Sequence, residues 1–340
     1  MAGAKRVFFV CNTKDYLDTF LLEVIRKYAK GFIRLGYDIQ VFGYNNALFQ
    51  ASPFKSKTLT GCFYKSRVDD LLVRQVRNYA PHIVFVGFAR FLDGQSVRLM
   101  RDAAPNASFL GIDVDLWSEM HPRRVQAARE LDLILTTYAD KNLWSLGDAS
   151  VKCVFMPNMS DPDVEYRYDV GSEWKSDILY TGQCEYRRHP TDSIRPQLIR
   201  KMAAMKNCTL YGCCGKPRIY GMRYFYAISG SRIGLSINAD NSIRLYHSDR
   251  LTHYLSCGTF VLAKRVPDTD LLFKDGLHLR YFDTADEFFE LAKWYLEHET
   301  ERKKIADTGM KWTHEHYNCV KMAGHILDLV AKGSYSAPWT

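Results

Sequence analysis

The chain has 340 residues, of which 47% are hydrophobic and 25% are charged, as in a typical globular protein. This length is sufficient for two domains that each bury a core of their own. No apolar run approaches the roughly 18 to 20 residues of a membrane-spanning helix. The run VFFV near the N-terminus is also too short for the core of a signal peptide, so we expect a cytoplasmic protein.

The nine cysteines are irregularly spaced and odd in number, which favours reduced thiols and again a cytoplasmic location. Their one cluster is CTLYGCCGK, at residues 208–216. It lacks a second pair of Cys or His residues at the spacing of zinc ligands. The sequence therefore predicts no metal site.

The net charge of +8 is spread unevenly along the chain. Residues 1–160 hold 21 Lys and Arg against 15 Asp and Glu, a net of +6, and residues 161–340 hold 25 against 23, a net of +2. This excess suggests that the first half faces an anionic partner, such as the inner face of a membrane or an acidic substrate. A solvated basic face explains this mild excess nearly as well. We expect no nucleic-acid partner, because no nucleic-acid-binding module is recognisable.

Short apolar runs alternate with helical patterns in the first half. Strands are predicted at residues 6–12, 37–45, 82–88, 107–115, 131–138 and 151–159, and helices at 18–36 and 66–81. Strands of nearly continuous Val, Ile, Leu and Phe that are separated by helices are typical of parallel strands buried on both faces. The predicted fold class is therefore α/β, with a doubly wound sheet.

Residues 158–176 lose this periodicity and gain Asp, Pro, Gly and Ser, which indicates a linker. The alternation then restarts. Strands are predicted at 177–182, 208–212, 232–239, 259–264 and 278–282, and helices at 195–206, 223–229, 249–258, 284–309 and 311–333. We therefore expect two tandem Rossmann-like domains, at residues 1–160 and 161–320, that face a cleft. Ligands of such sheets bind beyond the carboxyl ends of the strands.

One stretch of the second half, HSDRLTHYLSCGTFVLAKRVPDTDLLFKDGLHLRYFDTADEF, has a recognisable layout. Its elements are Ser248, Arg250, His253, Cys257-Gly258, a strand at 259–263, Asp275-Gly276, and Thr284 followed by Asp286-Glu287. This layout resembles the donor-binding module of GT-B glycosyltransferases. More narrowly, it is similar to the "glycosyl transferases group 1" branch that includes spore-maturation-type transferases. The resemblance covers roughly residues 177 to 320.

The resemblance implies a GT-B fold in which the second domain binds a nucleotide-diphosphate sugar and the first domain binds the acceptor. It implies a UDP-sugar in preference to a GDP- or dTDP-sugar, no other cofactor, and a C-terminal helix at 321–340 that crosses back to the first domain. The broad superfamily usually has Glu at the position of His253, so this chain departs from the pattern there.

Elementary chemistry agrees with a donor site at the start of the helix at 249–258. A helix N-terminus presents N–H groups and a positive dipole end, which suit a pyrophosphate. Ser248 precedes this helix, and Arg250 adds a charged, bidentate donor. His253, one turn later, could hydrogen-bond a ribose. The alternatives are a surface ion pair for Arg250 and a structural helix histidine for His253.

Other candidates for donor binding follow the neighbouring predicted strands. Gly182 ends one strand and lets the backbone approach a ligand closely, while Arg187 and Arg188 in the next loop could bind phosphate. Gly212 and Asn238 end two further strands at the same edge. Ordinary turns, and a solvent-exposed basic pair at a helix start, remain the alternative explanations.

The first half carries candidates for catalysis. Asp113 and Asp115 follow a predicted strand, and either carboxylate could act as a general base toward an acceptor hydroxyl. Asp15 and His121 are the candidates for acceptor binding. Two carboxylates near one site are also found in glycosidases, but the tandem α/β layout disfavours that class.

The sequence thus predicts a glycosyltransferase, of the hexosyltransferase type, that transfers a sugar from a nucleotide-diphosphate sugar to a glycan or glycolipid acceptor. Bacterial surface polysaccharide or lipopolysaccharide assembly is the expected setting. A nucleotide-sugar epimerase of the same fold, a non-catalytic small-molecule binding protein and an inactive partner subunit remain alternatives. A nicotinamide enzyme is disfavoured, because no Gly-x-Gly-x-x-Gly motif follows a predicted strand.

Overall fold

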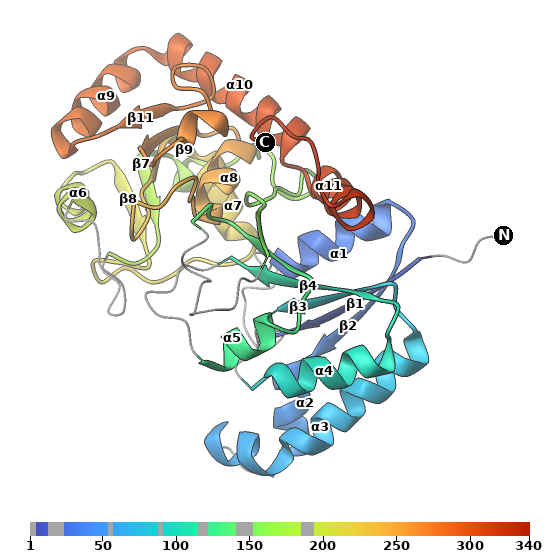
Figure 1. The fold of residues 1–340 in the computed structure, drawn as a ribbon. Coiled ribbons are helices and arrows are strands. Elements are labelled where there is room, and N and C mark those ends of the chain that lie inside the picture. Colours follow the sequence, from blue (N-terminus) through green and yellow to red (C-terminus); the bar gives the residue numbers. More distant parts are fainter. Residues whose placement is uncertain are drawn as a thin grey trace. The chain divides into compact units, whose positions relative to one another are not determined.

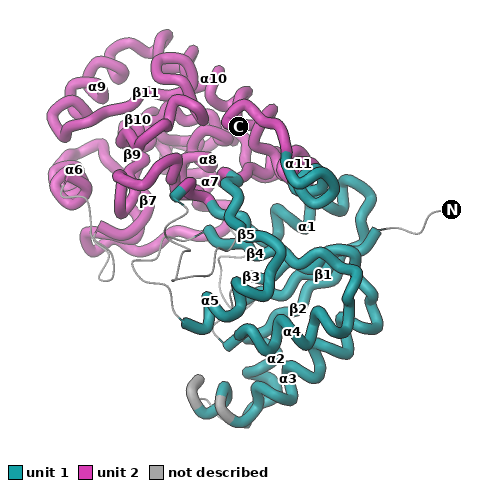
Figure 2. Tube along the Cα trace, viewed as in Figure 1, with its two compact units in different colours: residues 1–136, 140–156, 326–334 teal, residues 137–139, 157–325, 335–340 magenta. Residues whose placement is uncertain are grey.

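The structure is a computed structural model of the chain. It describes residues 5–12, 24–53, 57–87, 91–114, 122–140, 152–184 and 194–340. The chain divides into two compact units, which Figure 2 shows in different colours. Unit 1 comprises residues 1–136, 140–156 and 326–334, and unit 2 comprises residues 137–139, 157–325 and 335–340.

Unit 1 is built on a parallel sheet of six strands in the order β2-β1-β3-β4-β5-β6 (Figure 1). The strands are β1 (Arg6–Cys11), β2 (Asp38–Gly43), β3 (Ile83–Gly87), β4 (Ser108–Asp113), β5 (Leu133–Thr136) and β6 (Cys153–Phe155). The helices are α1 (Val24–Arg34), α2 (Tyr44–Ala51), α3 (Lys57–Tyr79), α4 (Gly94–Ala103) and α5 (Pro122–Ala128). The strands predicted in this half are confirmed, whereas α3 starts nine residues before the predicted helix at 66–81.

Successive side chains of β1 show why these strands are apolar throughout. Phe8 packs on Tyr79 of α3 with ring centroids 5.9 Å apart, and Phe9 packs on Phe32 of α1 with centroids 6.3 Å apart. Successive strand residues point to opposite faces of a sheet, so α1 and α3 cover opposite faces, as Figure 1 shows. Both faces of β1 are therefore buried.

Unit 2 has a parallel sheet of five strands in the order β11-β10-β9-β7-β8. The strands are β7 (Ser176–Thr181), β8 (Cys208–Tyr211), β9 (Ser231–Ser236), β10 (Phe260–Lys264) and β11 (Arg280–Phe282). The helices are α6 (Ile194–Ala203), α7 (Met222–Ser229), α8 (Asp249–Ser256), α9 (Ala285–Glu297), α10 (Glu299–His316) and α11 (Cys319–Lys332), with 3-10 turns at Ser172–Trp174 and Thr269–Leu271.

The two faces of this second sheet carry different helices. One face holds a core in which β7 side chains such as Ile178 pack with Leu198 of α6 and Phe288 of α9. On the other face, a Cβ atom at Gly234 of β9 would overlap the ring of Tyr254. Helix α8 therefore lies directly against this face of the sheet.

The C-terminal helices differ from the prediction. The sequence indicated two helices, at 284–309 and 311–333, with a break after Gly309. The structure has three, because α9 ends before His298 and α10 continues through Gly309 to His316. The break before α11 lies at Asn318, whose Oδ1 accepts a hydrogen bond from the Lys321 N–H. Gly309 does not end a helix. It provides space for the backbone of His278, whose carbonyl oxygen a Cβ atom would overlap.

Helix α11 contains the division between the units, because residues 319–325 belong to unit 2 and Ile326–Ser334 belong to unit 1. Among the residues that the structure describes, no helix is both long enough and apolar enough to span a membrane.

A buried chain of hydrogen bonds fixes the segment that leads into α8. His247 Nε2 lies 2.7 Å from Thr269 Oγ1, which donates to Tyr281 Oη at 2.7 Å. The Tyr281 hydroxyl donates its single proton to the carbonyl of Phe273 at 3.0 Å. Thr269 must therefore accept from His247, so Nε2 of the imidazole carries a proton. Burial lowers the pKa of His247 to about 3, which is consistent with a neutral ring.

Two helical glycines provide a matched pair of stability tests. Gly309→Ala should destabilise the fold by about 1–3 kcal/mol, because the added methyl overlaps a backbone carbonyl that cannot easily move. Gly324→Ala in α11 should stabilise it by up to about 1 kcal/mol, because apart from its chain neighbours and the backbone of its own helix no atom of the described residues lies within 4 Å of the added Cβ. Chemical denaturation of both variants measures this difference. Equal effects of the two substitutions would contradict the proposed packing of α10.

His247 should make the stability depend on pH. The unfolded imidazole takes up a proton below its usual pKa of 6.5, whereas the folded ring stays neutral down to about pH 3. The unfolding free energy should therefore fall with decreasing pH, and His247 should account for about 2 kcal/mol between pH 7 and pH 5. Denaturation of wild type and His247→Gln across this range measures the contribution, since glutamine keeps a donor for Thr269.

A His247→Gln profile as steep as that of the wild type would show that other groups cause the pH dependence.

Candidate functional site

The strand order of unit 2 marks a place where a ligand is expected. From β7 the chain continues to β8 on one side, whereas from β9 it continues to β10 on the other side. Strands β7 and β9 are direct neighbours, paired at Ile178 with Ile233. Connections therefore leave this pair in opposite directions. Such a switch point forms a crevice beyond the carboxyl ends of the two strands, and ligands of open α/β sheets bind there.

Arg250 of α8 spans this switch point. Its Nη1 donates to the carbonyl of Thr181 at the end of β7, at 2.7 Å. Its Nη2 donates at 2.6 Å to the carbonyl of Ile237, just beyond β9, and lies 3.3 Å from Ser248 Oγ. The side chain is buried. The guanidinium group thus joins the ends of both strands and places a fixed positive charge between them.

Gly182 follows β7 and lies directly against this guanidinium group. A Cβ atom at Gly182 would come within 2.7 Å of Arg250 Nη1, and the residue has a φ of +135°. Gly212, after β8, has a φ of +82° and would place a Cβ atom 3.3 Å from the carbonyl oxygen of Gly182. Both positions require glycine because of backbone conformation and available space. The two glycines are adjacent, since Gly182 N donates to the carbonyl of Tyr211 at 2.9 Å.

Asn238 connects the end of β9 to the start of α8. Its Oδ1 accepts from the N–H of Ser248 at 3.0 Å, and its Nδ2 donates to the carbonyl of Tyr246 at 2.9 Å. Its own N–H donates to Asn241 Oδ1 at 3.1 Å. Ser248 has the extended backbone of an N-cap residue, so α8 begins at this edge of the sheet. The structure therefore brings together five of the predicted donor residues: Gly182, Gly212, Asn238, Ser248 and Arg250.

His253 lies one turn further along α8 and points elsewhere. Its Nδ1 is 3.2 Å from the hydroxyl of Tyr224 in α7, and its Nε2 is 3.6 Å from Oε1 of Glu165. Its ring also meets Phe225 edge-on, and both His253 and Glu165 are buried. A role in ribose binding stays a prediction, and it would require the ring to leave these partners.

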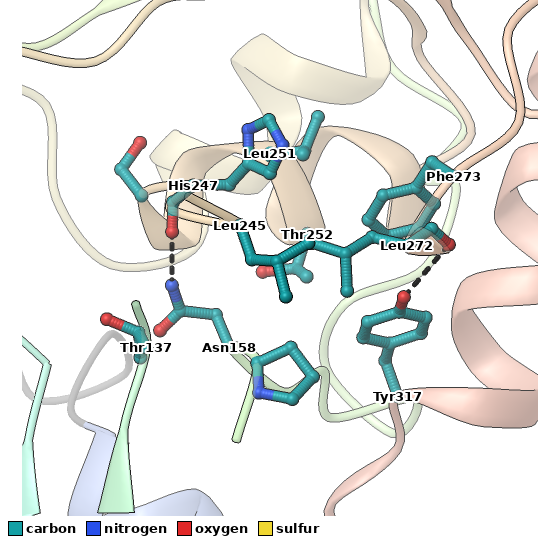
Figure 3. A pocket seen from close by; sticks show the side chains of 11 residues that line it. Thr137, Asn158, Leu245, His247, Leu251, Thr252, Leu272, Phe273 and Tyr317 are labelled. Atoms are coloured by element: carbon teal, nitrogen blue, oxygen red, sulfur yellow. Dashed lines mark hydrogen bonds between the residues drawn. The ribbon is translucent and has the colours of Figure 1, made fainter. Parts of the chain in front are cut away.

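A small pocket lies beside the start of α8 (Figure 3). Its lining includes Asn158, whose Nδ2 donates to the carbonyl of His247 at 2.7 Å, and Tyr317, whose hydroxyl donates to the carbonyl of Leu272 at 2.9 Å. Its volume is about 10 Å³. That is room for about one water molecule and not for a nucleotide.

In unit 1, Asp113 ends β4 and is buried. Its Oδ1 accepts a hydrogen bond from Arg124 Nη2 of α5 at 2.7 Å. Within the described ranges, no group of three or more His, Cys, Asp or Glu side chains could hold a metal ion. The remaining predicted site residues lie outside the described residues: Asp15, Asp115, His121, Arg187 and Arg188.

The sequence reasoning missed two buried residues of this edge, Tyr180 and Arg195. Arg195 Nη2 donates to Tyr180 Oη at 2.7 Å and to the carbonyl of Gln183 at 2.6 Å. A signal for Arg195 was present in the sequence. The apolar residues Leu198 and Ile199 follow at spacings of three and four, which place Arg195 on the inner face of α6.

Two comparisons with known proteins found matches: a family model matches part of the chain, and solved structures resemble its fold. Residues 170–328, just under half of the chain, match the family model described as "Glycosyl transferase-like". A search of curated proteins finds no match to the chain.

Many solved structures resemble the whole chain, among them the following three. HepE of Anabaena, solved with UDP and glucose, has 10% identity and a TM-score of 0.62, covering 96% of this chain and 99% of that chain. An alpha-glucosyltransferase, solved with UDP and a 13-mer DNA containing a HMU base, has 12% identity and a TM-score of 0.63, covering 97% and 100%. A UDP-N-acetylglucosamine 2-epimerase, so described for Listeria monocytogenes, has 10% identity and a TM-score of 0.56, covering 97% of both chains.

At these identities the likeness to solved structures concerns the fold. The predicted α/β fold class is confirmed, and the narrower resemblance to spore-maturation-type transferases stays a prediction. The chain therefore has the two-sheet α/β fold of GT-B glycosyltransferases, and its residues 170–328 are similar to the glycosyl transferase-like family.

Proposed function

We propose that the protein is a glycosyltransferase that uses a nucleotide-diphosphate sugar, with UDP as the preferred nucleotide. One observation carries the proposal: the buried guanidinium of Arg250 spans the switch point between β7 and β9. This edge lies within the segment that matches the glycosyl transferase-like family. The preference for UDP is supported by HepE and the alpha-glucosyltransferase, both of which were solved with UDP.

The residues at this edge suit a leaving nucleoside diphosphate. Sugar transfer places growing negative charge on the diphosphate, and preorganised positive groups stabilise it without rearrangement. The guanidinium group of Arg250 supplies a positive charge, and the carbonyls of Thr181 and Ile237 hold this group in place. The N-terminus of α8 at Ser248 adds its dipole, and Gly182 keeps the backbone free of a side chain there. Asn238 fixes the segment before the helix.

We propose Asp113 as the general base that takes the proton of the acceptor hydroxyl. Support comes from its place at the carboxyl end of β4, the edge at which such sheets carry their functional groups. We propose an anionic surface glycan or glycolipid as acceptor, on the basis of the net charge of +6 within residues 1–160.

One of the similar solved structures is described as an epimerase, so epimerisation of a UDP-sugar is the alternative function. An epimerase would convert the UDP-sugar without any acceptor. Incubation of the protein with UDP-sugar alone separates the two activities, because a transferase should leave the sugar configuration unchanged.

Nucleotide binding is the first test of the proposal. UDP at about a hundred times its dissociation constant should raise the unfolding free energy by about 2.7 kcal/mol. Thermal shifts with UDP, GDP, dTDP and CDP measure this effect and identify the base. Arg250→Lys should reduce the UDP shift, because a point charge cannot bond both strand ends as the guanidinium does. The absence of a shift with every nucleotide would refute the proposed donor site.

Asp113→Asn should separate catalysis from donor binding. Without a general base, kcat for transfer to an anionic glycan should fall by about 10²- to 10⁴-fold. The UDP thermal shift should not change, because Asp113 belongs to unit 1 and the proposed donor residues to unit 2. A purely structural role in the ion pair with Arg124 would instead lower the melting temperature and leave kcat near that of the wild type.

A further inference from the structure

The turn that follows β7 is held by a buried side chain of β7 itself. Tyr180 is completely buried, and its hydroxyl donates to the carbonyl of Gln183 at 2.8 Å. Arg195 of α6, also buried, donates to the same carbonyl at 2.6 Å and to the Tyr180 hydroxyl at 2.7 Å. These three groups form a closed triangle of hydrogen bonds, in which the Tyr180 oxygen both donates and accepts.

Two guanidinium groups also lie over the ring of Tyr180. The Cζ atom of Arg250 is 4.9 Å from the ring centroid, and that of Arg195 is 5.9 Å from it. A cation over an aromatic face is attracted by the ring quadrupole, and the attraction is stronger where water is excluded. Tyr180 therefore connects Arg195 to Arg250, the residue proposed to face the diphosphate.

These contacts determine how the backbone of the turn is oriented. Arg250 holds the carbonyl of Thr181, and Arg195 and Tyr180 hold the carbonyl of Gln183. In a trans peptide the carbonyl and the next N–H point in opposite directions. The carbonyl of Thr181 thus directs the Gly182 N–H toward Tyr211, to whose carbonyl it is bonded. The held carbonyl of Gln183 directs the following N–H away from Arg195.

We infer that Arg195 and Tyr180 are positioning residues for the donor diphosphate. They would not touch the donor. Instead they hold the turn at Gly182 in its unusual conformation, with a φ of +135°, and keep Arg250 in place. We call the hydrogen-bonded set of Tyr180, Arg195 and the Gln183 carbonyl the brace. Without the brace the turn would sample other conformations, and the free energy of donor binding would then include the cost of ordering the turn. This inference rests on the proposed use of a nucleotide-diphosphate sugar.

The test compares two brace variants with two matched controls elsewhere in unit 2. Tyr180→Phe and Arg195→Lys alter the brace. The control Tyr295→Phe removes another buried hydroxyl of unit 2, which accepts from Arg280 Nη1 at 3.2 Å. The control Arg302→Lys alters another buried guanidinium, which donates to the carbonyl of Tyr295 at 3.0 Å. Calorimetric titration with UDP and donor kinetics are measured below the melting temperature of each variant.

The brace variants should raise the dissociation constant of UDP by about tenfold, and KM for the donor should rise more than kcat falls. The controls should bind UDP within about twofold of the wild type, although all four substitutions lower the melting temperature. The double brace variant should be little worse than either single one, because both residues hold the same carbonyl. If Arg195→Lys fails to fold, the test relies on Tyr180→Phe, because this substitution removes only one oxygen atom.

Two results would overturn the inference, and they differ. If the wild type binds UDP and the brace variants bind it equally well while melting earlier, Tyr180 and Arg195 serve stability alone. If the wild type itself binds no nucleoside diphosphate, the proposed function fails first, and the positioning role fails with it.

Discussion

The second sheet of this protein depends on one buried guanidinium group. Parallel strands that part at a switch point leave backbone carbonyls at their carboxyl ends without a neighbouring strand beyond them. Arg250 supplies donors to two such carbonyls, at Thr181 and Ile237. The same contact requires a glycine at position 182, since any side chain there would meet Nη1. The ends of β7 and β9, the start of α8 and the turn at Gly182 are thus determined together.

Burying a guanidinium is costly unless its donors are satisfied. In this structure the Nη atoms of Arg250 and Arg195 donate to backbone carbonyls and to the Tyr180 hydroxyl, and Arg250 also lies over the ring of Tyr180. Their positive charge is consequently held at the carboxyl edge of the sheet, in surroundings of low dielectric where electrostatic interactions are strong. An arrangement made for stability therefore also suits the binding of an anion, and the two roles need not be separate.

Helix α8 is anchored along its length, which gives the edge its rigidity. Arg250 bonds to the strand ends, Tyr254 donates to or accepts from Thr181 through its hydroxyl, and His253 contacts Tyr224 and Glu165. These contacts join α8 to the ends of β7 and β9 and also to α7, which restrains the N-terminus of α8. A site of this kind is preorganised, so a bound diphosphate would find the positive groups already in place.

The sequence by itself determined the strands of both sheets and the residues that end them, because buried strands and glycine turns are signalled by local patterns. It therefore located Gly182, Gly212, Asn238, Ser248 and Arg250, which the fold brings to one edge. Only the tertiary structure decided where side chains point within a helix that is buried on several faces. It turned His253 inward toward Glu165 and showed α10 continuing through Gly309. It also joined Arg195 to Tyr180, because such contacts link segments whose proximity no local pattern encodes.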